Sequence, residues 1–280
     1  MIGHRVSRWG ALTIAVWLAA TTAWAQTATP QAPSQTATPP APFEPKVGQA
    51  GKDVVWVPTP QALVDKMLEL AKVTPQDYLI DLGSGDGITV ITAAKRGLTA
   101  LGIEYNPDMV ELAKRKAVEA KVTDKATFVK ADIFESDLSK ATVITMFLLP
   151  QLNLKLRPTI LNLKPGTRIV SNSFTMDDWQ PDETATVTDG CTSWCTALFW
   201  VVPAKVDGSW KLGTADLALT QQFQKISGSL GGTPIADGSL KGDQISFTVG
   251  TAKYTGRVTG NAMQGTITGG SGATWSASRP

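Results

Sequence analysis

Apolar residues in the middle of the chain fall into two kinds of run, short continuous ones and longer ones with helical spacing. The short runs, which predict buried strands, lie at 78–82, 100–104, 126–130, 142–146 and 168–173. The helical runs lie at 61–71, from about 89, at 107–120 and at 151–163. Strand–helix alternation over this length predicts an α/β fold with a doubly wound, mostly parallel Rossmann-like sheet.

The pattern changes twice toward the C-terminus. Segments 184–188 and 197–202 predict two strands joined by a turn, which we expect to form an antiparallel hairpin at the sheet edge. Residues 204–280 contain short alternating strands punctuated by Gly, Ser and Thr, which predict a small antiparallel β domain, either a meander or a barrel. Its large aromatic residues are expected to form the core: Trp210, Phe223, Phe247, Tyr254 and Trp275.

The first 50 residues show no such alternation. Arg5 and Arg8 precede an apolar run at 11–20, and Ala23-Trp24-Ala25 is a small-x-small cleavage signal. Residues 1–25 therefore predict a signal peptide cleaved near Ala25, with export to the periplasm; an uncleaved anchor is the alternative. Residues 26–50, rich in Pro, Ala and Thr, predict a disordered linker, which leaves 51–203 as the α/β domain. No later segment is long and apolar enough to be a transmembrane span.

Composition excludes several functions. The net charge is only +2, from 26 basic and 24 acidic residues, so we expect no nucleic-acid partner. His4, the only histidine, lies in the predicted signal peptide, which leaves the mature chain without an imidazole base or His-ligated metal. Two cysteines cannot supply a thiolate zinc site, so no metal is expected. Nothing in the sequence indicates the oligomeric state.

A glycine-rich turn carries the main chemical signal. Asp81-Leu82-Gly83-Ser84-Gly85-Asp86-Gly87 follows one predicted strand and precedes a helix, where backbone N–H groups can approach a ligand. Glu104 ends the next strand, about 20 residues later, where a carboxylate can accept both hydroxyls of a ribose. This spacing is typical of a nucleotide-binding loop.

Two ligand types compete for this loop. A dinucleotide motif requires a third glycine where this chain has Ile88, and the Asp81 carboxylate would repel a pyrophosphate. Asp81 can instead accept from an amino group, and Asp132, which follows another strand, can accept from an adenine amine. The pattern therefore favours a phosphate-free ligand that contains adenosine and an amino acid.

Residues 51–203 resemble the class I S-adenosylmethionine-dependent methyltransferases, and within them the branch of mitochondrial protein-lysine methyltransferases that act on the ATP synthase c-subunit and the adenine nucleotide translocase. The matching segments are 57–60, 81–87, 102–104, 147–150, 166–171 and 179–181. The resemblance implies an enzyme with S-adenosylmethionine as its cofactor and a protein lysine as its methyl acceptor. This chain departs from the branch at position 88, where it has Ile88 and a basic residue is common. It also departs from the branch in its predicted export.

The resemblance also implies residue roles. It places Asp81, Gly83 and Gly85 around the methionine part of the cofactor, Glu104 at the ribose and Asp132 at the adenine. The neighbouring Ser84, Gly87 and Ile133 are expected in the same cofactor site.

On the acceptor side we expect Phe147, Leu148 and Pro150, which follow the fourth strand, although these can equally be core and turn residues. Asp177, Asp178 and Trp179 are candidates for a rim that attracts a cationic acceptor, or else form a solvated loop.

Several alternatives stay open at this point. Cys191 and Cys195 can form a disulfide in an oxidising compartment or remain two free structural cysteines. The acceptor can be a small molecule instead of a protein. The α/β domain can also be an exported, non-catalytic module that binds an adenosine ligand. A dinucleotide-dependent oxidoreductase is disfavoured by Ile88.

Overall fold

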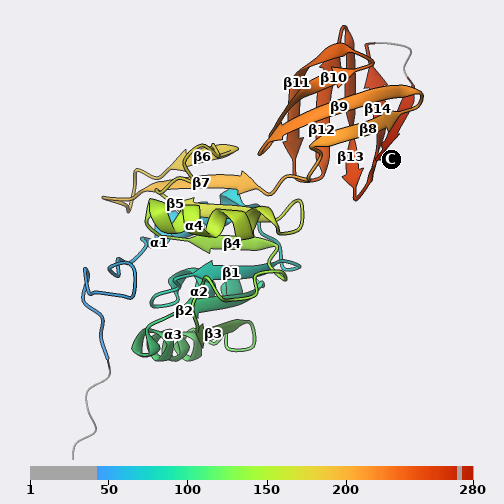
Figure 1. The fold of residues 1–280 in the computed structure, drawn as a ribbon. Helices are drawn as coiled ribbons and strands as arrows, with labels where there is room; N and C mark the ends of the chain where they lie inside the picture. The colour runs from blue at the N-terminus through green and yellow to red at the C-terminus, as the bar shows by residue number, and fades with distance from the viewer. Residues whose placement is uncertain (1–42, 270–272, 280) are drawn as a thin grey trace, which may run out of the picture. The chain divides into compact units, whose positions relative to one another are not determined.

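The computed structural model describes residues 43–269 and 273–279 (Figure 1). The predicted signal peptide and residues 26–42 of the predicted linker lie outside the described residues. Within the described part, no helix has the length and apolar character needed to cross a membrane.

The predicted doubly wound sheet is confirmed. Its seven strands lie in the order β3-β2-β1-β4-β5-β7-β6, with parallel pairing from β3 to β5 and antiparallel pairing of β5 with β7 and of β7 with β6. The strands are β1 Tyr78–Leu82, β2 Thr99–Glu104, β3 Ala126–Lys130, β4 Val143–Met146, β5 Arg168–Asn172, β6 Glu183–Thr186 and β7 Thr196–Val201. The order of the strands reverses at the parallel pair β1 and β4, with β2 and β3 on one side and β5 on the other, so ligand-binding residues are expected at the carboxyl ends of these strands.

Helices cover both faces of this sheet (Figure 1). The helices are α1 Gln61–Leu70, α2 Ile88–Lys95, α3 Pro107–Glu119 and α4 Pro150–Leu161. One apolar cluster joins α1, α2 and α3 to one face, and a second joins α4 to the other. Successive strand residues belong to different clusters, as Leu79 and Ile80 show, because side chains alternate across a strand.

Two helix starts differ in how well local sequence predicts them. α3 begins as expected for a proline in the first turn, and the Asn106 side chain caps it by accepting from the Asp108 N–H at 2.9 Å. At α1, Thr59 would suit the cap position by residue type, but Pro60 occupies that position and no side chain caps the helix. The buried face of α1, including Leu63 and Met67, therefore holds it in place.

A short hairpin precedes α1; we call residues 46–58 the strap. Its two arms are joined by the Gly48 N–H, which donates to the Trp56 carbonyl at 2.9 Å, and by the Trp56 N–H, which donates to the Gln49 carbonyl at 2.8 Å. The structure thus places residues 46–50 in an ordered hairpin, instead of in the linker that composition predicts.

The C-terminal strands form a closed, eight-stranded antiparallel barrel, in the order β10-β11-β12-β13-β14-β15-β8-β9 (Figure 1). They are β8 Gly208–Leu212, β9 Ala215–Gln222, β10 Lys225–Leu230, β11 Thr233–Lys241, β12 Gln244–Val249, β13 Ala252–Thr259, β14 Ala262–Thr268 and β15 Thr274–Ser278. Of the two predicted architectures, the barrel is therefore the one adopted.

The barrel is filled by the aromatic residues predicted for its core, with one exception. Trp210, Phe247 and Trp275 are buried, and Tyr254 packs against them with its ring 4.8 Å from that of Phe247. Phe223 lies outside this cluster. The interior is thus occupied by side chains, as in other small barrels.

Candidate cofactor and acceptor site

A cavity of about 560 Å³ lies at the carboxyl ends of the parallel strands, in the size range of small-molecule sites. Most predicted site residues line it: Asp81, Gly83, Ser84, Gly85, Glu104, Asp132, Ile133, Phe147 and Leu148. Gly87 and Pro150 do not line it. The sequence thus predicts the wall of this cavity well, apart from two positions whose roles are structural.

Asp81 is the most deeply placed carboxylate. It is the last residue but one of β1, has 7% of its surface exposed and accepts a hydrogen bond from the Thr145 hydroxyl on β4 at 2.7 Å. Burial raises the pKa of Asp81 to about 7, and the nearby Glu104 and Asp86 carboxylates add to this rise while the Thr145 hydroxyl opposes it. A carboxylate in this state favours a cationic partner, because an ammonium group would stabilise its charge.

Glu104, at the end of β2, is fixed by two backbone donors. One oxygen accepts from the Gly85 N–H and the other from the Asn106 N–H, each at 2.9 Å. The first bond ties the glycine-rich turn after β1 to the end of β2. Since each carboxylate oxygen can accept further bonds, Glu104 keeps the capacity to bind a pair of hydroxyl groups.

Asp132 follows β3 and is engaged by the strap. One of its oxygens accepts from the Phe134 N–H at 2.9 Å and the other from the Lys52 ammonium at 2.5 Å. The Lys52 hydrogen bond and the Phe134 N–H lower the pKa of Asp132, so this carboxylate is ionised at neutral pH. The Lys52 ammonium also lies 5.0 Å from the centre of the Tyr105 ring, on the same part of the wall.

A side chain is excluded at two glycines of the turn by different neighbours. Gly85 has φ +53°, and a Cβ there would lie 2.8 Å from the Trp56 indole nitrogen of the strap. Gly87 has φ +84°, and a Cβ there would lie 2.7 Å from the Phe128 ring and 2.9 Å from Ala113. The prediction of Gly87 as a cofactor contact is therefore corrected: it starts α2 and allows that helix to pack against β3 and α3.

The donors and acceptors of the wall fit S-adenosylmethionine. Three carboxylates, those of Asp81, Glu104 and Asp132, can accept from ammonium, hydroxyl and amine groups. Among the residues that line the cavity, Lys52 is the one basic side chain, and it is already paired with Asp132. A phosphate-free ligand suits this set better than a dinucleotide.

Aromatic side chains form another part of the wall; we call Phe147, Phe174 and Trp194 the aromatic wall. Phe147 follows β4, Phe174 follows β5, and Trp194 belongs to the loop between β6 and β7. The Phe147 ring centre lies 5.9 Å from that of Phe174 and 6.1 Å from that of Trp194. Of the predicted acceptor-side residues, Phe147 thus contacts two further aromatic residues that sequence reasoning missed.

Leu148 and Pro150 have different positions. Leu148 is buried and contributes to both the cavity wall and the core cluster around α4. Pro150 is exposed and starts α4, so its expected place on the acceptor side is corrected. Its fixed φ suits the first turn of a helix, which explains its occurrence there.

The acidic rim suggested by the sequence is wrong for Trp179. That residue is fully buried, and its carbonyl accepts from the Trp200 indole at 2.8 Å. Asp177 and Asp178 are exposed, and Asp178 pairs with Arg157. None of these residues lines the cavity.

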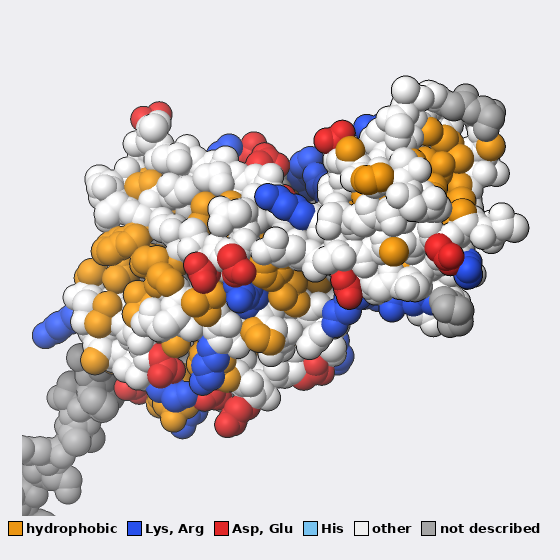
Figure 2. All heavy atoms as spheres, turned by 45° about the horizontal axis from the view of Figure 1, so that its top comes forward, with side chains coloured by type: hydrophobic (Ala, Val, Ile, Leu, Met, Phe, Trp, Pro, Cys, Tyr) orange, Lys and Arg blue, Asp and Glu red, His pale blue; other side chains and the backbone are white. Residues whose placement is uncertain are grey.

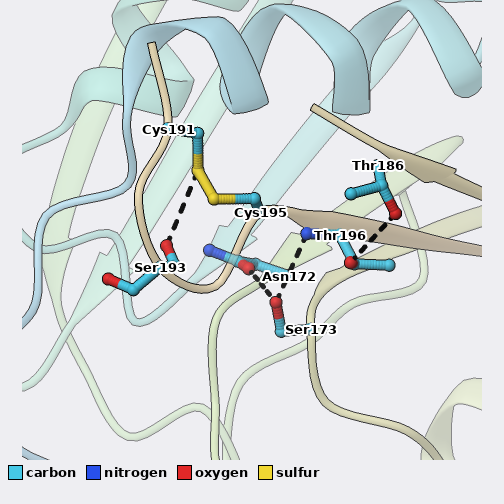
Figure 3. Close-up of a disulfide and its surroundings, with 7 residues drawn as sticks. All are labelled: Asn172, Ser173, Thr186, Cys191, Ser193, Cys195 and Thr196. Carbon is cyan, nitrogen blue, oxygen red and sulfur yellow. Dashed lines mark hydrogen bonds between the residues drawn. A yellow bond between two sulfur atoms is a disulfide. The ribbon is translucent and has the colours of Figure 1, made fainter. Parts of the chain in front are cut away.

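Cys191 and Cys195 are joined by a disulfide, which closes the loop that carries Trp194 (Figure 3). The two cysteines lie between β6 and β7, as the predicted hairpin requires. No free cysteine occurs among the described residues.

Comparison with known proteins places the α/β domain in a family. The profile of the ANTKMT methyltransferase domain matches residues 81–183. A protein-lysine N-methyltransferase of Saccharolobus islandicus is 46% identical over 140 residues, which are 49% of this chain and 87% of that protein. The ATP synthase c-subunit lysine N-methyltransferase of Mus musculus is 36% identical over 107 residues, 38% of this chain and 43% of the mouse protein.

A solved structure agrees with these relatives. The crystal structure of an RNA methyltransferase from Salinibacter ruber, in complex with S-adenosyl-L-homocysteine, is 46% identical with a TM-score of 0.50, and the match covers 54% of this chain and 96% of that one. S-adenosylhomocysteine is the demethylated product of S-adenosylmethionine, so the relative binds the cofactor that the carboxylates and glycines of this cavity suit. The chain belongs to the class I S-adenosylmethionine-dependent methyltransferases, in the branch related to the ATP synthase c-subunit and adenine nucleotide translocase lysine methyltransferases.

Proposed function

We propose that this chain is an exported protein-lysine N-methyltransferase. The observation that carries the proposal is the meeting of three carboxylates and an aromatic wall in one cavity of a chain 46% identical to an archaeal protein-lysine N-methyltransferase. The carboxylates supply a cofactor side, and the aromatic wall supplies an apolar side for the acceptor.

On the cofactor side, each carboxylate has its own partner. Asp81 accepts from the α-ammonium group, Glu104 from the two ribose hydroxyls and Asp132 from the exocyclic amine of adenine. When bound, S-adenosylmethionine supplies an electrophilic methyl group on its sulfonium. The protein aligns this group with the acceptor and excludes water, and it needs no strong base.

On the acceptor side, the apolar wall favours an uncharged amine. A lysine must lose its proton before its nitrogen has a free electron pair. Phe147, Phe174 and the buried Met146 line this part of the cavity, and such surroundings disfavour the ammonium form and lower the pKa of an entering lysine. Beyond His4 the sequence has no histidine to take the proton, so desolvation is the means that the chain offers.

A protein acceptor is favoured over RNA by the charge of the molecule. The Salinibacter ruber relative is named an RNA methyltransferase, and RNA-binding domains usually carry a strong basic excess. This chain has a net charge of +2, and on the face shown in Figure 2 basic and acidic side chains are interspersed. A continuous basic surface is absent from that face.

Two features support export. Residues 1–25 have the charged, apolar and small-residue regions of a signal peptide. The Cys191–Cys195 disulfide is of a kind that persists in oxidising compartments such as the periplasm. Cell fractionation together with N-terminal sequencing tests this part: we expect a periplasmic protein that begins at Gln26, and a cytoplasmic protein with an intact N-terminus contradicts it.

Methyl transfer is tested with the purified full chain and methyl-labelled S-adenosylmethionine. Envelope proteins and total RNA from cells lacking the gene serve as acceptors, and mass spectrometry locates the added methyl groups. We expect label on lysine residues of one or a few proteins, and none with the Asp81→Asn variant. Label on RNA or small molecules refutes the lysine assignment, and binding of the cofactor without any transfer supports a non-catalytic module.

A further inference from the structure

Trp194 has an unusual position for a large apolar residue. It is 45% exposed, yet it lines the cavity and its ring lies 6.1 Å from that of Phe147. Its φ of +51° lies in the left-handed region, which bulky residues rarely adopt. Such a conformation persists only where the surrounding structure enforces it, and it often occurs at functional sites.

The surrounding structure enforces this conformation in two ways. The disulfide between Cys191 and Cys195 encloses Trp194 in a ring of five residues. At the base of the loop, the Val187 N–H donates to the Cys195 carbonyl at 2.9 Å. The tryptophan is therefore held on a short, closed loop, although its side chain is half exposed.

The same loop is tied to the segment that carries Phe174. The Ser173 N–H donates to the Thr196 carbonyl at 2.7 Å. Figure 3 shows a second bond, in which the Thr196 N–H donates back to the Ser173 hydroxyl at 3.5 Å. Ser173 precedes Phe174, and Thr196 follows the disulfide directly. These bonds fix the relative positions of two members of the aromatic wall.

We propose that the disulfide-closed loop positions Trp194 as the outer wall of the methyl-acceptor site, where its indole contacts the side chain of the entering lysine. This deepens the proposed function and rests on it. An indole face attracts a cation and packs against a methylene chain, so it can receive a lysine before its proton is lost. Phe147 and Phe174 then provide the apolar surface further in. Trp194 is a binding residue, and Cys191 and Cys195 are positioning residues.

Kinetics of the full chain, with its disulfide verified by mass spectrometry, test the proposal on the acceptor found above. We expect Trp194→Ala to raise the acceptor KM about three- to thirty-fold, the range of a cation–π contact, with a smaller change in kcat. Trp194→Phe restores most of the affinity. The double variant Cys191→Ser/Cys195→Ser raises KM in the same direction, because the loop is no longer closed.

Two controls separate this role from a general effect on folding. The affinity for S-adenosylhomocysteine, measured by calorimetry, stays within about two-fold in every variant, because the cofactor carboxylates are untouched. Thr192→Ala, an exposed position in the same loop that does not line the cavity, leaves KM unchanged. An unchanged KM in Trp194→Ala, or an equal loss in Thr192→Ala, overturns the proposal.

A binding measurement that needs no turnover completes the test. Nα-acetyl-lysine methylamide is added to protein with ¹⁵N-labelled indoles and bound S-adenosylhomocysteine, with the Trp194 resonance assigned from Trp194→Phe. We expect this resonance to shift with the lysine probe and not with its norleucine analogue, and no shift at millimolar probe refutes the role of Trp194. If the chain methylates an acceptor other than lysine, the proposed function as a lysine methyltransferase is wrong. The effect of Trp194→Ala on the KM of that acceptor then still decides whether Trp194 belongs to the acceptor site.

Discussion

The ammonium of Lys52 lies 2.5 Å from a carboxylate oxygen of Asp132, although the two residues are 80 positions apart in the chain. The strap thereby reaches the part of the cavity proposed to hold adenine. The Lys52 pKa is raised mainly by its hydrogen bond to Asp132, although solvent around it limits the strength of the pair. Because of this ion pair, the amine of a bound adenine and the Lys52 ammonium would both donate to the Asp132 carboxylate.

Asp132→Asn is therefore expected to weaken cofactor binding. The amide is a poorer acceptor than a carboxylate, and loss of a charge-assisted hydrogen bond corresponds to about a ten- to hundred-fold rise in the Kd for S-adenosylhomocysteine. Lys52→Met is expected to lower the Kd about two- to five-fold, since it frees the carboxylate oxygen. Calorimetry measures both, and an unchanged Kd in Asp132→Asn removes this residue from the site.

The pKa of Asp81, about 7, predicts that cofactor binding depends on pH. Below pH 7 the carboxyl is mostly protonated, and it must release its proton before it can accept from the cofactor's ammonium group. We expect the Kd to rise about tenfold from pH 8 to pH 6, with proton release detected as a dependence of the binding enthalpy on the buffer. Asp81→Asn provides the control: it binds more weakly and with no such pH dependence. A flat wild-type profile contradicts the prediction.

Gly85→Ala tests the contact between the glycine turn and the strap. The new Cβ would lie 2.8 Å from the Trp56 indole, and φ at this position is +53°. Gly260 is a matched control because its φ is +57° and nothing lies within 4 Å of a Cβ there. Both variants bear a similar backbone cost of about 1–2 kcal/mol, but only Gly85→Ala is expected to raise the cofactor Kd. Equal Kd values for the two variants would show that the strap can move away from the new Cβ without weakening cofactor binding.

Phe247→Ala tests whether the barrel core is energetically separate from the cofactor site. Phe247 is fully buried among the barrel residues, and its removal is expected to cost about 3–5 kcal/mol of unfolding free energy. Chemical denaturation followed by fluorescence measures this loss, with the exposed Val118→Ala as a control near zero. The Kd for S-adenosylhomocysteine is expected to stay within about two-fold, and a large rise points to a role of the barrel in the site.

Local sequence determined which residues meet at the cofactor side. Asp81 and Glu104 lie at the ends of predicted strands and Asp132 follows one, and parallel strands end at one edge of a sheet, so their chain order alone predicts that they gather. The alternation of strands and helices likewise predicts the Rossmann-like sheet and the edge hairpin. These inferences hold because periodicity and strand direction are local or topological properties.

Tertiary structure decided the rest, because those features depend on contacts between distant segments. No pattern in residues 46–58 indicates that they fold over Asp132, and Gly87 proves to be a packing position only once Phe128 is known to lie against it. Likewise, nothing around Trp194 predicts its distance from Phe147. Such contacts follow from how whole elements pack, and a single sequence carries no local signal for them.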